Sequence, residues 1–227
     1  MFVGSARARS PRTMALCGVA VAGQLAFVAA WVIAGALESG YSAADQTVSE
    51  LAAGGAANPW ILWLGLLSLS FSDGSTALLL RERLGFAGWL PAAMFAVAGL
   101  GVLVILALPL DCMVNGDAAC DARVDAGEAS WQHRGHNVAA VSVQLILVVT
   151  PFAVAYALRR RPRLAWWAFA AGVVGVATVL AVATSDPGAA GYGIYQRVTF
   201  GFVHLWVIAI AVAAFRGRRS RAGVVRG

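Results

Sequence analysis

The sequence contains no lysine and few charged residues of any kind. All 17 basic residues are arginine, and charged residues make up 12% of the 227-residue chain, about half the share of roughly 25% in soluble domains. Hydrophobic residues make up 60% of the chain, and its mean hydropathy is +0.75. So little charge with so much apolar mass excludes a soluble globular domain and a disordered chain. The composition therefore predicts an integral membrane protein.

Several motifs of well-known catalytic classes are also absent. The chain has no Walker loop for phosphate, no nucleophile elbow and no HExxH zinc motif. It shows no convincing internal repeat, which argues against the repeat architecture of secondary transporters. Histidine and cysteine are scarce, with three of each. The positions of individual polar residues are therefore the main guide to function.

Six apolar stretches are each long enough to cross a membrane. They are Met14–Leu37, Pro59–Leu80, Ala87–Leu110, His136–Leu158, Ala165–Thr184 and Gln196–Phe215. About 20 helical residues cross ~30 Å of hydrocarbon, and lipid offers no partner for unpaired backbone groups. We therefore predict an all-α fold, an integral membrane bundle of six transmembrane helices over residues 14–215. The first stretch is too long for the apolar region of a signal peptide, so we interpret it as a span.

The arginines are unequally divided between the two ends of these predicted helices. Fourteen of the 17 fall at one end, and they are Arg7, Arg9, Arg12, Arg81, Arg83, Arg159, Arg160, Arg161, Arg163, Arg216, Arg218, Arg219, Arg221 and Arg226. By the positive-inside rule both termini are cytoplasmic, with a basic N-terminus over residues 1–13 and an Arg-rich tail over 216–227. The net charge of +6 is thus a sign of topology and of attraction to anionic lipid, and we expect no nucleic-acid partner.

The source and the membrane follow from the same composition. The absence of lysine, together with abundant Ala, Gly, Val and Arg, indicates a GC-rich bacterial genome. We therefore expect a multi-pass protein of the bacterial plasma membrane. Membrane lipid is the expected partner, while the oligomeric state is not determined by the sequence.

Three charged residues cluster at the predicted outer ends of the helices. Glu50 ends the run Thr47-Val48-Ser49-Glu50, which either starts a short interfacial helix or points its carboxylate into the mouth of the bundle. Asp111, after the third span, is either an ordinary interfacial acid or a carboxylate at the lip of a cavity. Arg197, which opens the sixth span, either forms a salt bridge across the mouth or binds an anion, since guanidinium pairs with carboxylate and phosphate alike.

The three histidines suggest a less favoured metal site. His133 and His136 lie three positions apart and share a face if the helix is continuous, so they either chelate a metal or act as interfacial caps. His204 lies well inside the sixth span. A metal-dependent enzyme would use all three as ligands, with Glu50 or Asp111 activating a water molecule. The greater depth of His204 argues against this arrangement.

Asp73 is the acidic residue placed inside a predicted span. It lies in the polar run Ser68-Leu-Ser-Phe-Ser-Asp-Gly-Ser-Thr76 of the second span. We expect its carboxyl to pair with Arg81, with Arg83 or with a serine hydroxyl. The alternative is a proton or ion site, because charged groups inside lipid are costly and often functional.

Two of the three cysteines fall in one predicted outer loop. Cys112 and Cys120 are eight positions apart, and an oxidising compartment outside a bacterial plasma membrane would favour a disulfide between them. A metal site is the weaker alternative, because the pair lacks the spacing of a CxxC motif. Cys17 is expected to be a small buried residue of the first span.

The order of several short motifs resembles a family of bacterial and archaeal membrane proteins, the domain-of-unknown-function family numbered 998. The matching pieces are Tyr41-Ser42, Thr47-Val48-Ser49-Glu50-Leu51, Asn58-Pro59-Trp60, Leu108-Pro109-Leu110-Asp111, His136 with Ala139-Ala140, Tyr195-Gln196-Arg197 and Leu205-Trp206. The resemblance covers about residues 14–215 and implies a six-helix architecture with no established activity. The polar positions characteristic of the family correspond here to Glu50, Asp111, His136 and Arg197.

A second and weaker resemblance is to the membrane zinc hydrolases of the alkaline-ceramidase superfamily. Those enzymes use three histidines, an aspartate and a serine, and this chain has three histidines with Asp111 and Ser49. The superfamily has seven spans and an H-x3-H pair, whereas this chain has six predicted spans and H-x2-H. These departures argue against a zinc hydrolase.

Three functional hypotheses follow from the sequence. The first is a non-enzymatic protein with an outer-facing polar pocket for a lipid headgroup or a small amphiphile. Arg197 would hold an anionic group, with Glu50, Asp111 and His136 orienting the ligand and His204 on the same helix face as Arg197.

The second hypothesis is a membrane-embedded enzyme, and the third is a transporter. A membrane-embedded enzyme would use the same His, Asp and Glu residues as metal ligands or as acid and base. A small transporter would use Asp73 and Glu50 as stations on a proton path. No cofactor is identified by the sequence, and a purely structural role would explain most of the residues equally.

Overall fold

The computed structural model describes residues 10–216, which are mainly helical and contain no strand. The six long helices are α1 (Pro11–Leu37), α2 (Pro59–Leu84), α3 (Trp89–Ala107), α5 (Trp131–Ala157), α6 (Pro162–Ala183) and α7 (Tyr192–Arg216). The short elements are the helix α4 (Ala118–Asp125) and the 3₁₀ turns η1 (Ser49–Ala52), η2 (Gly85–Gly88) and η3 (Val114–Gly116). The predicted all-α fold is confirmed. Most of the predicted N-terminal segment and nearly all of the Arg-rich tail lie outside the described residues.

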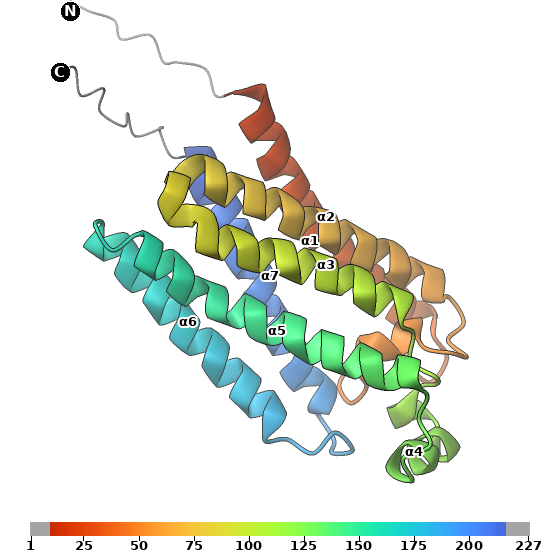
Figure 1. The fold of residues 1–227 in the computed structure, drawn as a ribbon. Coiled ribbons are helices and arrows are strands. Elements are labelled where there is room, and N and C mark those ends of the chain that lie inside the picture. The colour runs from red at the N-terminus through yellow and green to blue at the C-terminus, as the bar shows by residue number, and fades with distance from the viewer. Residues whose placement is uncertain (1–9, 217–227) are drawn as a thin grey trace, which may run out of the picture.

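Five helical stretches of the described chain are long and apolar enough to cross a membrane. One of them, Pro59–Ala107, is 49 residues long and contains α2, η2 and α3. Gly85, with a φ of 59°, ends α2 and lets the chain reverse, so that α2 and α3 lie side by side (Figure 1). Each of the six predicted apolar stretches thus falls mainly within one long helix.

The helix boundaries differ from the predicted ones where local chemistry decides them. α3 ends at Ala107 and not at Leu110, because Pro109 disfavours helical backbone in the residue before it. α5 begins at Trp131, five residues earlier than predicted, because the Ser130 hydroxyl accepts a hydrogen bond from the His133 amide and caps the helix.

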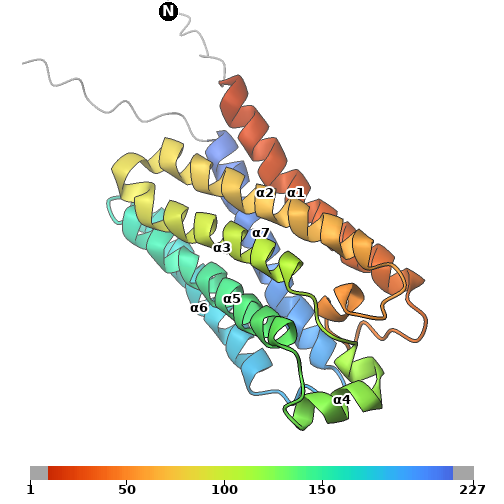
Figure 2. The same cartoon turned by 45° about the vertical axis from the view of Figure 1, so that its right-hand side comes forward.

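The long helices pack in a ring. Each contacts the next in the order α1, α2, α3, α5, α6 and α7, and α7 closes the ring against α1 and also contacts α2. The start of α1 and the end of α7 lie at one end of the bundle, together with η2, and this is called the η2 end (Figures 1 and 2). The opposite end carries α4 and the longer loops and is called the α4 end (Figure 2).

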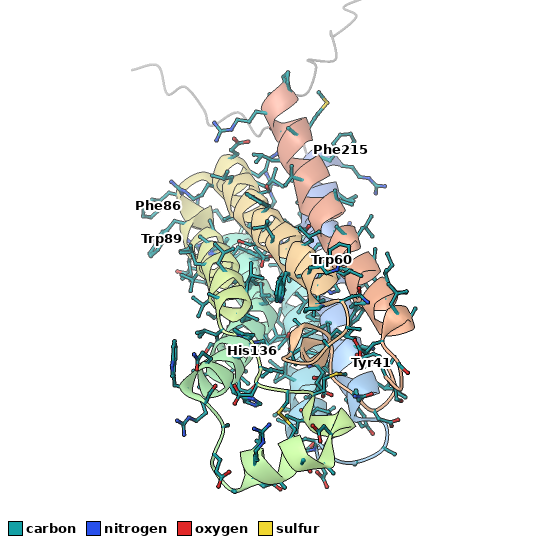
Figure 3. The ribbon with its side chains drawn as sticks, turned by 90° about the vertical axis from the view of Figure 1, so that its right-hand side faces the viewer. Tyr41, Trp60, Phe86, Trp89, His136 and Phe215 are labelled. Atoms are coloured by element: carbon teal, nitrogen blue, oxygen red, sulfur yellow. A yellow bond between two sulfur atoms is a disulfide. The ribbon has the colours of Figure 1, made fainter. Side chains whose placement is uncertain are left out.

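The outer surface of the bundle is apolar, with tryptophan at both ends. Trp60 and Trp131 lie in the first turn of their helices at the α4 end and are 54% and 65% exposed. Trp89 lies at the η2 end with the exposed Phe86, away from His136 and Tyr41 (Figure 3). Exposed apolar sides and aromatic residues near both ends are typical of a bundle that sits in a bilayer.

Small residues bring α1 and α2 close together. A Cβ atom built on Gly23 would lie 2.4 Å from the backbone oxygen of Ser68, and one built on Gly65 would lie 2.7 Å from the Cβ of Ala30. No side chain fits at either glycine without movement of the neighbouring helix. Close approach of this kind is usual between membrane helices. Lipid removes the hydrophobic driving force for helix association, and small residues instead allow close van der Waals packing.

The turn η1 is folded into the α4 end of the bundle. Glu50, Leu51 and Ala52 are buried, and η1 contacts both α1 and α2. In Figure 3 this short turn lies between the labelled His136 and Tyr41. The loop between α1 and α2 thus covers the interior of the ring at this end.

Candidate functional site

Glu50 is buried, and its carboxylate is used within its own loop. The residue is 1% exposed. Its oxygens accept hydrogen bonds from the Gln46 amide at 3.1 Å, the Thr47 hydroxyl at 3.1 Å and the Thr47 backbone N–H at 3.3 Å. The sequence allowed either a short helix at Glu50 or a carboxylate that points into the mouth of the bundle. The structure forms the short helix, as the 3₁₀ turn η1. Three donors offset much of the cost of burying the carboxylate.

Arg197 fastens this loop to α7. Its Nη1 donates to the backbone oxygens of Gln46 at 2.8 Å and Gly193 at 3.0 Å, and its Nη2 donates to the Tyr41 hydroxyl. The guanidinium carbon also lies 5.4 Å from the centre of the Trp31 ring, within the range of a cation–π contact. Among residues 10–216, no ion pair involves Arg197. The salt bridge expected across the mouth is therefore not formed.

A further contact joins the same loop to the start of α7, and another lies within the loop. The side-chain oxygen of Gln196 accepts a hydrogen bond from the Val48 N–H at 2.8 Å, and the Tyr41 hydroxyl donates to the Thr47 carbonyl at 2.9 Å. Burial raises the pKa of the Tyr41 hydroxyl, which the nearby Arg197 opposes. The hydroxyl is therefore protonated at neutral pH and available as a donor.

Asp111 connects the end of α3 to the start of α5. Its carboxylate accepts hydrogen bonds from the Ser130 N–H at 2.8 Å and the Ser130 hydroxyl at 2.5 Å, and its own N–H donates to Nδ1 of His133 at 3.3 Å. The two hydrogen bonds from Ser130 hold the pKa of Asp111 below its ordinary value. The carboxylate thus stabilises the N-terminus of α5.

The predicted disulfide is present beside Asp111. Cys112 and Cys120 are bonded, with their Cα atoms 6.1 Å apart. The bond links the segment that follows α3 to the start of α4. Cys17 is buried in α1, as expected, and its thiol donates to the Ala211 carbonyl of α7 at 3.4 Å.

A cavity of about 70 Å³ lies inside the ring, beneath η1. Its walls come from α1, α2, α3, α5, α7 and η1, and they are mainly apolar. Representative apolar residues are Phe27, Leu62, Leu66, Val102, Leu147 and Phe200, and the polar ones are Ser49, His136, Gln144 and His204. An apolar cavity with a few convergent polar groups is the usual form of a small-molecule site.

His136 presents one unpartnered nitrogen in this cavity wall. The residue is 3% exposed, and its Nδ1 lies 2.7 Å from the Leu108 carbonyl oxygen. A carbonyl only accepts hydrogen bonds, so Nδ1 carries the proton and Nε2 of the neutral ring is an acceptor. Within the described part of the chain, this buried Nε2 has no hydrogen-bond partner.

His204 is held in the same way through a chain of side chains. The Ser72 hydroxyl donates to the Ala20 carbonyl at 2.6 Å and accepts from the Gln24 amide nitrogen at 2.8 Å. The amide oxygen of Gln24 therefore faces Nδ1 of His204, which donates to it. Nε2 of His204 is buried and lacks a partner among residues 10–216. Both cavity histidines thus have a bare Nε2.

His133 does not join the other two histidines. It is buried beside Asp111 and is not part of the cavity wall. Within the described residues, no three His, Cys, Asp or Glu side chains are grouped so that they could hold a metal ion. The metal site of His133, His136 and His204 is therefore not assembled in this structure.

Comparison with known proteins places the chain in a family. A family model described as "Protein of unknown function (DUF998)" matches residues 21–213. The chain belongs to the DUF998 family. This confirms the resemblance drawn from the short motifs. No curated protein and no solved structure matches the chain.

Asp73 of this DUF998 protein does not form the pairs expected from the sequence. Both carboxyl oxygens are buried in α2 and have no hydrogen-bond partner in the described chain. No serine hydroxyl reaches them, and Arg81 donates instead to the Gly85 carbonyl at 2.6 Å. A Cβ atom built on Gly99 of α3 would lie 3.4 Å from the Cβ of Asp73, so the residue lies at the α2–α3 contact.

Four polar positions in or behind the cavity wall were missed by sequence reasoning or given little weight. They are Gln24, Ser49, Ser72 and Gln144. An uncharged amide in the middle of an apolar stretch, as at Gln24 and Gln144, is a usable signal, because lipid makes every unpaired polar group costly. The charged residues at the helix ends are the more conspicuous signal in the sequence, but the structure uses them to hold the loops.

Proposed function

We propose that this DUF998 protein crosses a bacterial plasma membrane six times, with both termini in the cytoplasm and the α4 end outside. The excess of arginine at the η2 end supports this orientation. The disulfide at the α4 end supports it too, since disulfides persist on the oxidising side of a plasma membrane.

The same proposal gives the cavity beneath η1 the function of binding a lipid-like amphiphile. The observation that carries it is the pair of buried, unpartnered Nε2 atoms of His136 and His204, two residues that line a mainly apolar cavity. A buried polar atom without a partner costs about 1–3 kcal/mol. A ligand with an apolar chain and a polar group would fill the space and supply the missing hydrogen bonds.

The residues proposed from the sequence have separate roles in this function. Glu50, Asp111 and Arg197 hold the loops and η1 over the cavity, while His136 and His204 contact the ligand. The family's characteristic polar positions thus divide into a cover and a contact surface. Arg197 does not bind an anion in this proposal, because its guanidinium is hydrogen-bonded to the loop between α1 and α2.

The test is retention of a ligand by the purified full-length chain. Ala140 lines the cavity, so Ala140→Phe fills it. Its neighbour Val141 is 59% exposed on the outer surface, which makes Val141→Phe a matched control. Native mass spectrometry should show a bound amphiphile on the unmodified protein and on V141F, and none on A140F. An empty unmodified protein, or equal retention by A140F, would overturn the proposal.

Proton transport is a second candidate, favoured by the buried carboxyl of Asp73. The hydrogen-bonded chain of His204, Gln24 and Ser72 runs from the cavity to the residue before Asp73 in α2. Such intramembrane carboxyls often mark proton or ion paths. Reconstituted vesicles with an internal pH dye would report proton flux that Asp73→Asn abolishes. Absence of flux in the unmodified protein would exclude this candidate.

A further inference from the structure

The hydrogen-bonding capacity of the cavity is determined by contacts behind its wall. Nδ1 of His136 is held by a backbone carbonyl, and Nδ1 of His204 is held by the amide oxygen of Gln24. Both rings therefore keep an acceptor at Nε2, and both residues line the cavity. The amide nitrogen of Gln144 is also buried without a partner within the described chain, and it is a donor. The unpartnered buried atoms of the lining residues are thus two acceptors and one donor group.

We infer that the ligand is an uncharged lipid whose headgroup carries hydroxyl groups, such as a monoacylglycerol. A hydroxyl donates to an imidazole Nε2 and also accepts from the Gln144 amide, so it satisfies both kinds of unpartnered atom. The inference rests on the proposed amphiphile-binding function and names its ligand class.

Charged headgroups are disfavoured by the same wall. A phosphate or carboxylate oxygen only accepts, so it would face the lone pairs of both histidines. Within the described chain, no arginine lines the cavity to pair with an anion, and no acidic side chain lines it to pair with a cation. An ion placed there would lose its hydration without gaining an opposite charge.

The volume fits a headgroup with the start of an alkyl chain. About 70 Å³ exceeds what one water molecule needs several-fold. The apolar residues around the histidines, including Leu62, Val102 and Leu147, suit methylene groups better than a cluster of water. A chain with hydroxyl groups at one end matches this division of the wall.

Three probes with the same oleoyl chain test the inference. They are 1-oleoylglycerol, its 2,3-di-O-methyl ether, which has no donor, and oleoyl lysophosphatidic acid, which is anionic. Binding to the detergent-purified full chain is measured by native mass spectrometry titration. We expect 1-oleoylglycerol to bind at least about tenfold more tightly than either other probe. The ether has no donor and leaves the histidine acceptors unpaired, while the phosphate of lysophosphatidic acid loses its hydration without gaining an opposite charge.

The outcomes separate this inference from the proposed function. Equal binding of the methyl ether would overturn the hydroxyl requirement and leave an amphiphile site standing. Tightest binding of the lysophosphatidic acid would overturn the uncharged class. Failure of all three probes, with Ala140→Phe identical to the unmodified protein, would show a cavity that holds only water and would overturn both.

A variant of Gln24 tests the origin of the preference. Gln24 contacts no ligand in this proposal, and it positions His204 by accepting its Nδ1 proton. In Gln24→Leu, the His204 ring is free to carry its proton on Nε2, so the preference for 1-oleoylglycerol over the ether should shrink several-fold. Nitrogen-15 NMR of labelled histidine should show the change of tautomer. An unchanged tautomer with an unchanged preference would contradict the positioning role, and the probe series on the unmodified chain does not depend on this variant.

Discussion

The mouth of the bundle and the cavity beneath it treat their polar groups in opposite ways. At the mouth, Glu50 has three donors, Asp111 has two and Arg197 has three acceptors. In the cavity, His136 and His204 each have one buried atom without a partner. The charged groups at the mouth are therefore satisfied, while the two histidines of the cavity are not.

This difference separates residues that maintain the structure from residues that are free to bind. A group whose hydrogen bonds are all made within the protein gains nothing from a ligand, and its removal leaves its partners unpaired. A buried group without a partner gains a hydrogen bond from a ligand, and its removal costs the free protein little. Substitutions at the mouth should thus change stability, and those in the cavity should change binding.

The largest effect is expected from Arg197→Ala. The variant loses three hydrogen bonds and the contact with the Trp31 ring, and we expect its free energy of unfolding to fall by about 3 kcal/mol. Thermal unfolding in detergent measures the change. The exposed Arg134 provides the matched control, and R134A should unfold like the unmodified protein. A melting temperature for R197A equal to that of R134A would contradict the idea that residues at the mouth stabilise the fold.

Loss of the disulfide should have the next largest effect. Replacing Cys112 and Cys120 with serine removes a short cross-link, which the chain-entropy model values at about 2–3 kcal/mol. Unfolding should therefore occur at a lower temperature, and dithiothreitol should lower the melting temperature of the unmodified protein to that of the double variant. Retained ligand should be unchanged, because neither cysteine lines the cavity. Loss of ligand would show that ligand binding in the cavity depends on the disulfide-bonded loop at the α4 end.

Asp111→Asn should destabilise the protein by about 1 kcal/mol at neutral pH, the usual size of a helix-capping effect. The hydrogen bonds from Ser130 lower the pKa of the native carboxyl, so the charged form stabilises the folded state. That contribution is present above the ordinary aspartate pKa of about 4 and is lost as pH falls through the lower native value. The difference in melting temperature between D111N and the unmodified protein should therefore narrow below about pH 4. A constant difference across this range would contradict the capping role.

Gln144→Met should have the smallest effect on stability. The substitution keeps a similar shape and removes a buried amide nitrogen that lacks a partner. We therefore expect the free energy of unfolding to rise slightly, by less than about 1 kcal/mol. The same variant should bind 1-oleoylglycerol more weakly, since its hydroxyl loses a donor. A large loss of stability would mean that this amide supports the fold.

Much of the fold was predictable because the bilayer restricts the choices. Each of the six apolar stretches falls mainly within a long helix, since an apolar segment of that length has no other way to pair its backbone in lipid. Local chemistry then shifted the ends. Pro109 shortened α3, and Ser130 lengthened α5. Both residues are visible in the sequence, but span boundaries taken from the apolar pattern alone do not include their effects.

The candidate site was predicted only in part. His136 and His204 were identified as ligand-binding candidates and do line the cavity, but Glu50, Asp111 and Arg197 are bonded elsewhere. The bond from Arg197 to Gln46 joins residues 151 positions apart. No local pattern encodes such a contact, because it depends on how α7 closes the ring against α1.

The sequence by itself determined that this chain is a helical, apolar protein, because composition and apolar length are sums over residues and do not depend on how the helices meet. It also marked most of the polar residues that matter. Only the tertiary structure decided which of them are satisfied and which are not. Hydrogen bonds act over about 3 Å, so the difference between a structural residue and a binding residue depends on neighbours that are distant in the chain.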